Sequence, residues 1–63
     1  MNKLFEARRN KHMTREELGR AADVSPRTIE RYEQGRSALA DASYKVVIQI
    51  AAALGVDPSQ IVD

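Results

Sequence analysis

Apolar residues recur three and four positions apart along this chain, which is the spacing of amphipathic helices, and no segment alternates as a strand would. The clearest case lies in residues 41–54, where the apolar positions fall at i, i+3, i+4, i+7 and i+10. These positions are Tyr44, Val47, Ile48, Ala51 and Leu54. The pattern predicts a helix that buries this face, begins near Asp41 with Ser37 or Asp41 as its cap, and ends at Gly55.

Five helical segments are predicted along the whole chain. They cover about residues 2–10, 14–22, 25–35 and 41–54, with a last helical turn after Asp57-Pro58. In the first segment, Leu4, Ala7 and Arg8 share one face. No repeat, linker or low-complexity tract separates the segments, so we expect one all-α domain over residues 1–63.

The second predicted helix has a strong start signal. Thr14 and Glu17, three residues apart, can form a capping box in which each side chain bonds the other residue's backbone amide. Leu18, Ala21 and Ala22 are expected to face the core. Gly19 is small enough to let another segment approach closely.

The third predicted helix has signals at both ends. Ser25 can cap it, Pro26 suits its first turn, and Gly35 can end it with positive φ. Ile29 and Tyr32 can face a core. The other side carries a polar stripe at helical spacing: Arg27, Thr28, Arg31 and Gln34. Such a stripe suits a DNA major groove, and it also suits an ordinary solvated face.

Composition and charge narrow the function. The chain has 63 residues, no cysteine and one histidine, which argues against disulfides, a metal site or a bound cofactor. Its apolar runs are too short for a membrane span, and its charged start lacks a secretory signal, so we expect a cytoplasmic protein. Residues 1–36 hold nine Lys or Arg against six Asp or Glu, whereas residues 37–63 hold one against three. The first half is thus expected to meet an anionic partner.

No catalytic constellation is visible. Each serine is placed as a cap or turn residue, and the one histidine, His12, lies in a predicted connector. Glu16 and Glu17 are adjacent on a helix, so their carboxylates diverge. The chain is therefore not expected to be an enzyme.

With this layout, the chain resembles the lambdoid-repressor and Cro-like helix-turn-helix family, often called XRE-type regulators. The resemblance rests on three segments in order: LFEARRNKHMTREEL, VSPRTIERYEQGR and IAAALGVDPSQIV. It implies a compact five-helix lambda-repressor-like domain with the helix-turn-helix at helices 2 and 3. In the phage repressors of this family, the second helix of the motif lies in the major groove, which here implies residues 25–35.

The resemblance implies roles for individual side chains. Arg8 and Glu33 match a partly buried ion pair that joins helix 1 to helix 3. Arg27 and Arg31, helped by Thr28, match positions that read base edges, and an arginine fork suits guanine. Contacts to DNA phosphates are implied for Thr14, Arg15, Ser25, Gln34 and Arg36. The alternative for these side chains is a plain exposed face.

This sequence departs from the family pattern at four places. Pro26 replaces a common base-reading glutamine, and His12 stands where glycine usually ends helix 1 with positive φ. The segment from Gly35 to Tyr44 is about three residues longer than the common pattern and carries Ala38, Leu39 and Ala40 where relatives often have basic residues. Glu30 adds a negative charge to the recognition helix, where it is expected to pair with Arg27 and Arg31 or to accept from cytosine.

Two function classes follow. The first is sequence-specific binding of double-stranded DNA by a homodimer on a near-palindromic operator, acting on transcription. The dimer contact candidates are Val56, Ile61 and Val62, although Ile61 and Val62 can instead complete the monomer core. The alternative is a protein-interaction module on the same fold, such as an antitoxin-like component with weak or no DNA binding. No membrane or small-molecule partner is expected.

Overall fold

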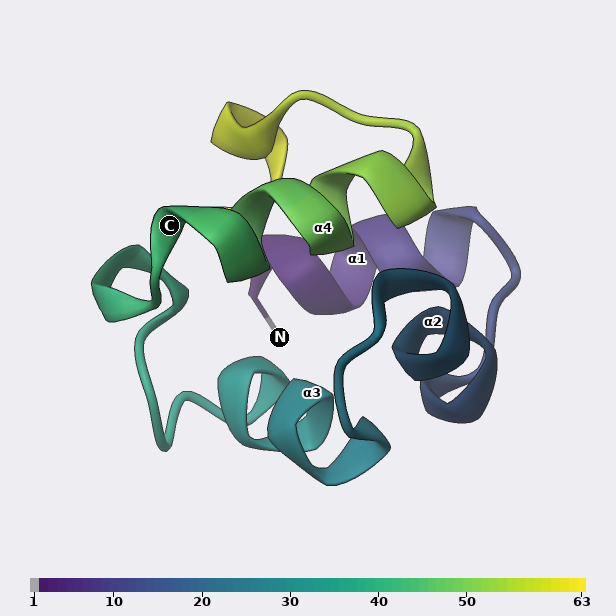
Figure 1. The fold of residues 1–63 in the computed structure, drawn as a ribbon, viewed down its shortest axis with the longest axis horizontal. Helices are drawn as coiled ribbons and strands as arrows, with labels where there is room; N and C mark the ends of the chain where they lie inside the picture. The colour runs from purple at the N-terminus through teal and green to yellow at the C-terminus, as the bar shows by residue number, and fades with distance from the viewer. Residues whose placement is uncertain (1) are drawn as a thin grey trace.

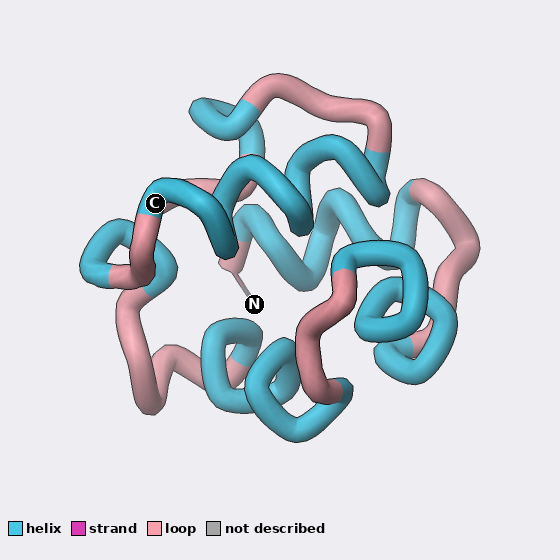
Figure 2. The backbone as a smooth tube through the Cα atoms, viewed as in Figure 1, coloured by secondary structure: helices cyan, strands magenta, loops and turns pink. Residues whose placement is uncertain are grey.

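The computed structural model describes residues 2–63 as four α-helices joined by turns (Figures 1 and 2). They are α1 (Lys3–Asn10), α2 (Arg15–Ala22), α3 (Pro26–Glu33) and α4 (Tyr44–Leu54). Within these residues no strand occurs, which confirms the all-α class. Met1, the first residue of the expected domain, lies outside the described residues.

The expected fifth helix is instead a short 3₁₀ turn. It spans only Pro58–Gln60, and a second such turn, Leu39–Asp41, precedes α4. Asp57 caps the last turn, and the Ser59 backbone amide and hydroxyl that face its carboxylate lower the pKa of Asp57. A Gln60 side chain that accepts from the Asp57 amide completes this cap. Two short-range bonds of this kind stabilise a turn, but three residues do not make an α-helix.

One large apolar side chain from each α-helix, and one from the C-terminal segment, is almost completely buried. They are Leu4, Leu18, Ile29, Ile50 and Ile61, each less than 2% exposed. Around them pack smaller or slightly more exposed residues: Ala22, Leu39, Val47, Ala51 and Leu54. Helix α2 packs against both α3 and α4. Because all four α-helices and the C-terminal segment contribute to one small core, the orientation of α3 depends on the others.

Helix α4 begins later and faces the core differently than the apolar spacing predicted. Ser43, not Ser37 or Asp41, caps it by accepting a hydrogen bond from the Val46 amide. Tyr44, expected in the core, is 79% exposed. The buried stripe is Val47, Ile50, Ala51 and Leu54. The predictions for Val47, Ala51 and Leu54 are therefore confirmed, whereas Tyr44 is exposed and Ile48 is only half-buried. Because Ile48 and Ile50 are both apolar, the spacing alone could not show that Ile50 is the buried one.

The segment between α3 and α4 contributes to the core as well. The 3₁₀ turn at Leu39–Asp41 directs Leu39 inward, where it is 7% exposed, although this segment was expected to be a plain connector. Together with the later start of α4, this turn accounts for the longer loop. On α2, the expectation for Leu18 and Ala22 is confirmed, whereas Ala21 is exposed.

The turn between α2 and α3 is tight because Gly19 has no side chain. Asp23 takes left-handed backbone geometry with φ of 57°, and the Val24 amide bonds back to the Gly19 carbonyl. A Cβ atom placed on Gly19 would lie 2.5 Å from the Val24 carbonyl oxygen and 3.2 Å from the Pro26 nitrogen. The start of α3 therefore lies against α2 at a distance that only glycine permits.

Gly19→Ala tests this close approach, because helix propensity predicts that the variant is more stable and packing predicts that it is less stable. Alanine at a free helical site adds about 1 kcal/mol of stability relative to glycine. Here we expect a loss of about 1–3 kcal/mol, since the backbone of the turn must move to admit the methyl group. Denaturant unfolding followed by circular dichroism measures the change.

The control is Ala21→Gly, at an exposed site on the same helix, which isolates the propensity term at about 1 kcal/mol of destabilisation. A Gly19→Ala variant that is more stable than the wild type would contradict the packing argument.

Candidate nucleic-acid interface

Helix α3 has one face in the core and one face in solvent. Ile29 is fully buried and Tyr32 is half-buried against the core. On the other side, Arg27, Arg31 and Gln34 are exposed and Thr28 is half-buried. The sequence therefore predicted correctly which side of α3 points outward. In Figure 1 this helix lies at the edge of the molecule, away from α4.

The exposed face of α3 and the start of α2 enclose a polar hollow. Four arginines and two glutamates line it together with one proline: Arg15, Glu16, Pro26, Arg27, Glu30, Arg31 and Arg36. These residues come from α2, α3 and the segment that follows α3. The arginines outnumber the carboxylates, so the hollow is suited to an anionic ligand.

Beneath this surface, Arg8 of α1 and Glu33 of α3 form the predicted ion pair. The Arg8 Nε donates to Glu33 Oε2 at 2.6 Å, and Nη2 donates to Oε1 at 3.1 Å. The Arg8 Nη1 also donates to the Met13 carbonyl oxygen at 2.9 Å. The side chains are 10% and 0% exposed. Such a fork-to-fork pair is directional, so it fixes α3 relative to α1.

Arg15 contacts the same carboxylate, which the sequence did not predict. Its Nε donates to Glu33 Oε1 at 3.0 Å, and its Nη1 lies 3.8 Å from Glu30 Oε2. Glu30 thus approaches Arg15, and the expected pairing with Arg27 and Arg31 is not among the ion pairs of residues 2–63. The expectation failed because Glu30 faces the first turn of α2, which sequence spacing within α3 cannot reveal.

The remaining candidate side chains are placed as follows. Arg31 Nη2 donates to Ser37 Oγ at 3.2 Å, and Gln34 Nε2 lies 3.5 Å from Glu30 Oε2. Arg36 and Arg27 reach the hollow with no ion pair among the described residues.

Thr14 and Ser25 act as the predicted helix caps. The Thr14 oxygen accepts from the Glu17 amide and the Ser25 oxygen from the Arg27 amide. Both residues are exposed, on the side where α2 and α3 begin. His12 has φ of 59°, which confirms that histidine takes the left-handed position that was noted for it.

The residues that were considered for a dimer contact divide into two groups. Ile61 is 1% exposed and belongs to the core, so its side chain is not available to a partner subunit. Val56 and Val62 are half-buried and pack against the core while keeping some accessible surface.

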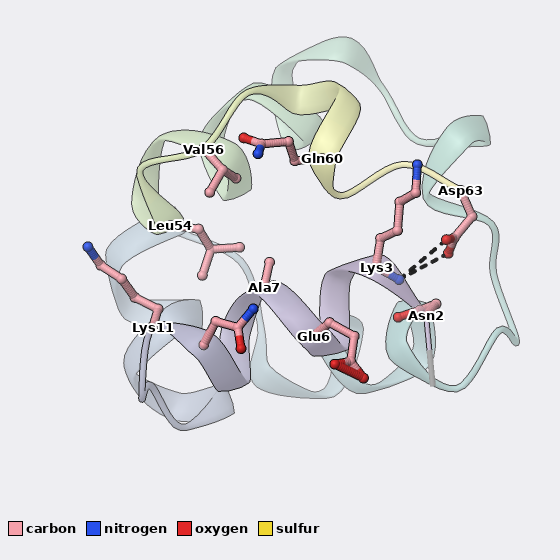
Figure 3. A pocket seen from close by; sticks show the side chains of 10 residues that line it. Asn2, Lys3, Glu6, Ala7, Lys11, Leu54, Val56, Gln60 and Asp63 are labelled. Atoms are coloured by element: carbon pink, nitrogen blue, oxygen red, sulfur yellow. Dashed lines mark hydrogen bonds between the residues drawn. The ribbon is translucent and has the colours of Figure 1, made fainter.

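A second groove lies between α1 and the C-terminal segment (Figure 3). Ala7, Leu54 and Val56 provide its apolar part. Charged residues stand on its rim, where two oxygens of Asp63 accept from the Lys3 amide at 3.3 and 3.4 Å. This groove is lined by elements other than α2 and α3, so it is separate from the polar hollow.

Residues 2–63 contain neither a candidate metal site nor a candidate membrane span. No group of three His, Cys, Asp or Glu side chains there could hold a metal ion. Nor does any helix in this range combine the length and apolar character that a membrane crossing requires.

Comparison with known proteins gives one match. A model of the helix-turn-helix family matches residues 4–61, which is nearly the whole chain. No curated protein and no solved structure gave a match.

Glu33→Ala tests the buried pair. Removing the carboxylate leaves the Arg8 guanidinium buried without its partner, which costs about 3–5 kcal/mol. Since a core of this size rarely supplies more than about 3–5 kcal/mol in total, we expect the variant to be largely unfolded at 25 °C. Thermal unfolding followed by circular dichroism measures the effect.

Glu30→Ala provides the comparison, because it removes the same group from the same helix at a side chain that is 44% exposed. It should change the stability by less than about 1 kcal/mol. Equal melting temperatures for the two variants would refute a structural role for the Arg8–Glu33 pair.

Proposed function

The chain belongs to the XRE- and Cro-like helix-turn-helix family of DNA-binding regulators, and we propose that it recognises a specific double-stranded DNA sequence with α3 in the major groove. The observation that carries this proposal is the exposed face of α3. Its arginines stand on a helix whose opposite face is locked into the core, and they line one hollow together with arginines from neighbouring segments.

The proposed base readers are Arg27 and Arg31, with Thr28 between them. Both arginines are exposed, and a guanidinium fork pairs bidentately with the O6 and N7 atoms of guanine. Thr28 can contact a thymine methyl group or a phosphate. The Pro26 side chain has no hydrogen-bond donor. We therefore expect less discrimination at the base pair that a glutamine at this position would read.

Phosphate contacts are proposed on both sides of the groove. They involve Thr14, Arg15, Ser25, Gln34 and Arg36. The hydroxyls of Thr14 and Ser25 stand at helix N-termini, where backbone amides favour an anion. Arg36 lies at the other end of α3, and the segment from Ser37 to Ser43 adds no basic side chain. We therefore expect the stronger backbone contacts at the start of α2.

We further propose that the protein binds as a homodimer, through the surface that Val56 and Val62 leave accessible. In phage repressors of this family, two recognition helices lie about one DNA turn apart, roughly 34–36 Å, on a near-palindromic operator. The protein would then regulate transcription in the cytoplasm, at the nucleoid, by occluding or recruiting polymerase. A protein-interaction module of the antitoxin type is the competing outcome.

Selection of binding sites from random DNA, followed by titration of the selected site at several salt concentrations, tests the proposal. Each neutralised phosphate contributes about −0.9 to the slope of log K against log salt, so we expect a slope of several units. Arg27→Ala should weaken the selected site by roughly 1–3 kcal/mol while changing the affinity for random DNA much less.

Arg9→Ala is the charge-matched control, since Arg9 is exposed on α1 and lies outside the hollow. Binding that depends on neither salt nor sequence would contradict the regulator function and favour the interaction module.

Val62→Asp tests the dimer surface. A charge buried at a subunit contact is unfavourable, so we expect the variant to sediment as a monomer and to lose its preference for two half-sites over one. Sedimentation velocity and titration of single and paired half-sites measure these effects. A wild-type chain that sediments as a monomer, on and off DNA, would exclude the dimer.

A further inference from the structure

We infer that Glu33, besides pairing with Arg8, positions Arg15 for contact with a DNA phosphate. One buried carboxylate would thus support both the fold and part of the DNA backbone contact. This inference rests on the proposed function, because it explains how one of the proposed phosphate contacts is built.

The position of the Glu33 carboxylate is strongly constrained. Its side chain is 0% exposed, and Oε2 accepts from Arg8 Nε at 2.6 Å. The other oxygen, Oε1, accepts from two guanidinium groups: Arg8 Nη2 at 3.1 Å and Arg15 Nε at 3.0 Å. A carboxylate that is buried and bound on both oxygens has little freedom to rotate. It therefore offers Arg15 a fixed acceptor.

The hydrogen bond to Glu33 uses only the Nε of the Arg15 guanidinium group. A guanidinium group has five N–H donors, of which the Nε hydrogen points to Glu33. The remaining donors are on Nη1 and Nη2, the pair that matches a phosphate bidentately. The Arg15 side chain is 32% exposed and lines the polar hollow beside Arg27 and Arg31. The terminal nitrogens are thus held at the wall of the surface that we assign to DNA.

Glu30 does not compete strongly for these donors. Its nearest oxygen is 3.8 Å from Arg15 Nη1, which is longer than an ordinary N–H···O hydrogen bond. Its side chain is 44% exposed, so water weakens the attraction. A phosphate approaching Arg15 would replace this loose contact, whereas the Nε bond to Glu33 can stay intact.

This arrangement requires arginine and not merely a positive charge. A free arginine side chain carries about 2 kcal/mol of rotamer entropy, and part of that is lost on binding. With Nε already fixed by Glu33, part of this loss occurs on folding and not when DNA binds. Lysine has a single nitrogen, so it cannot bond Glu33 through one group while presenting a fork to a phosphate.

The test compares Arg15→Lys with Arg15→Ala on the selected DNA site at several salt concentrations. If Glu33 positions the guanidinium, both variants should bind roughly tenfold more weakly, which corresponds to loss of one charge-assisted hydrogen bond. Arg15→Ala should also reduce the salt slope by about 0.9. The control pair, Arg9→Lys and Arg9→Ala, should stay within about twofold of the wild type.

Glu33→Gln tests the positioning residue itself, at a temperature where circular dichroism shows the variant folded. A neutral amide holds Arg15 less firmly, so its DNA affinity should fall as in Arg15→Ala, and the double variant should show no additional loss. If Glu33→Gln does not fold, the Arg15→Lys comparison decides.

The possible failures are distinct. If Arg15→Lys binds like the wild type, charge alone matters and the positioning role is overturned. If Arg15→Ala also binds like the wild type, Arg15 contacts no phosphate. If the wild-type chain itself lacks salt-dependent, sequence-specific binding, the proposed function fails, and this inference fails with it.

Discussion

The buried ion pair between Arg8 and Glu33 is the interaction on which the rest of this structure depends. The apolar core holds the helices together but is not directional, whereas a fork-to-fork pair at 2.6 and 3.1 Å fixes how α3 lies against α1. Replacing such a pair with apolar residues can be neutral for stability, so its value here is geometric. It fixes the orientation of α3 against α1, and through Glu33 it also reaches Arg15 at the polar hollow.

Local signals predicted much of the fold correctly. The capping box at Thr14 and Glu17, the Ser25 cap and the positive φ of Gly35 depend on residues within a few positions of one another. The errors occurred where several arrangements satisfy the same pattern. In α4 both Ile48 and Ile50 are apolar, and only the packing of the folded chain shows that Ile50 is buried while Tyr44 is exposed. Likewise, nothing in the local sequence shows that Leu39 would turn inward.

Part of the candidate site was also predictable from the sequence. The exposed stripe of α3 follows from its helical period, and the Arg8–Glu33 pair follows from the family resemblance. The contacts of Arg15 with Glu33 and Glu30 do not, because they join α2 to α3 across a turn whose tightness depends on Gly19. Sequence spacing within one helix contains no information about that distance. The structure therefore changes Arg15 from an isolated charge into part of a connected network.

Base substitution in the selected DNA site is the most direct test of whether α3 reads base edges in the major groove. Replacing guanine with 7-deazaguanine removes the N7 acceptor from the major groove, whereas replacing guanine with inosine removes only the minor-groove amino group. We expect 7-deazaguanine to weaken binding at particular guanines and inosine to have little effect. Arg27→Ala or Arg31→Ala should abolish the sensitivity to 7-deazaguanine at one of these guanines. Affinity that responds to inosine but not to 7-deazaguanine would contradict base reading in the major groove.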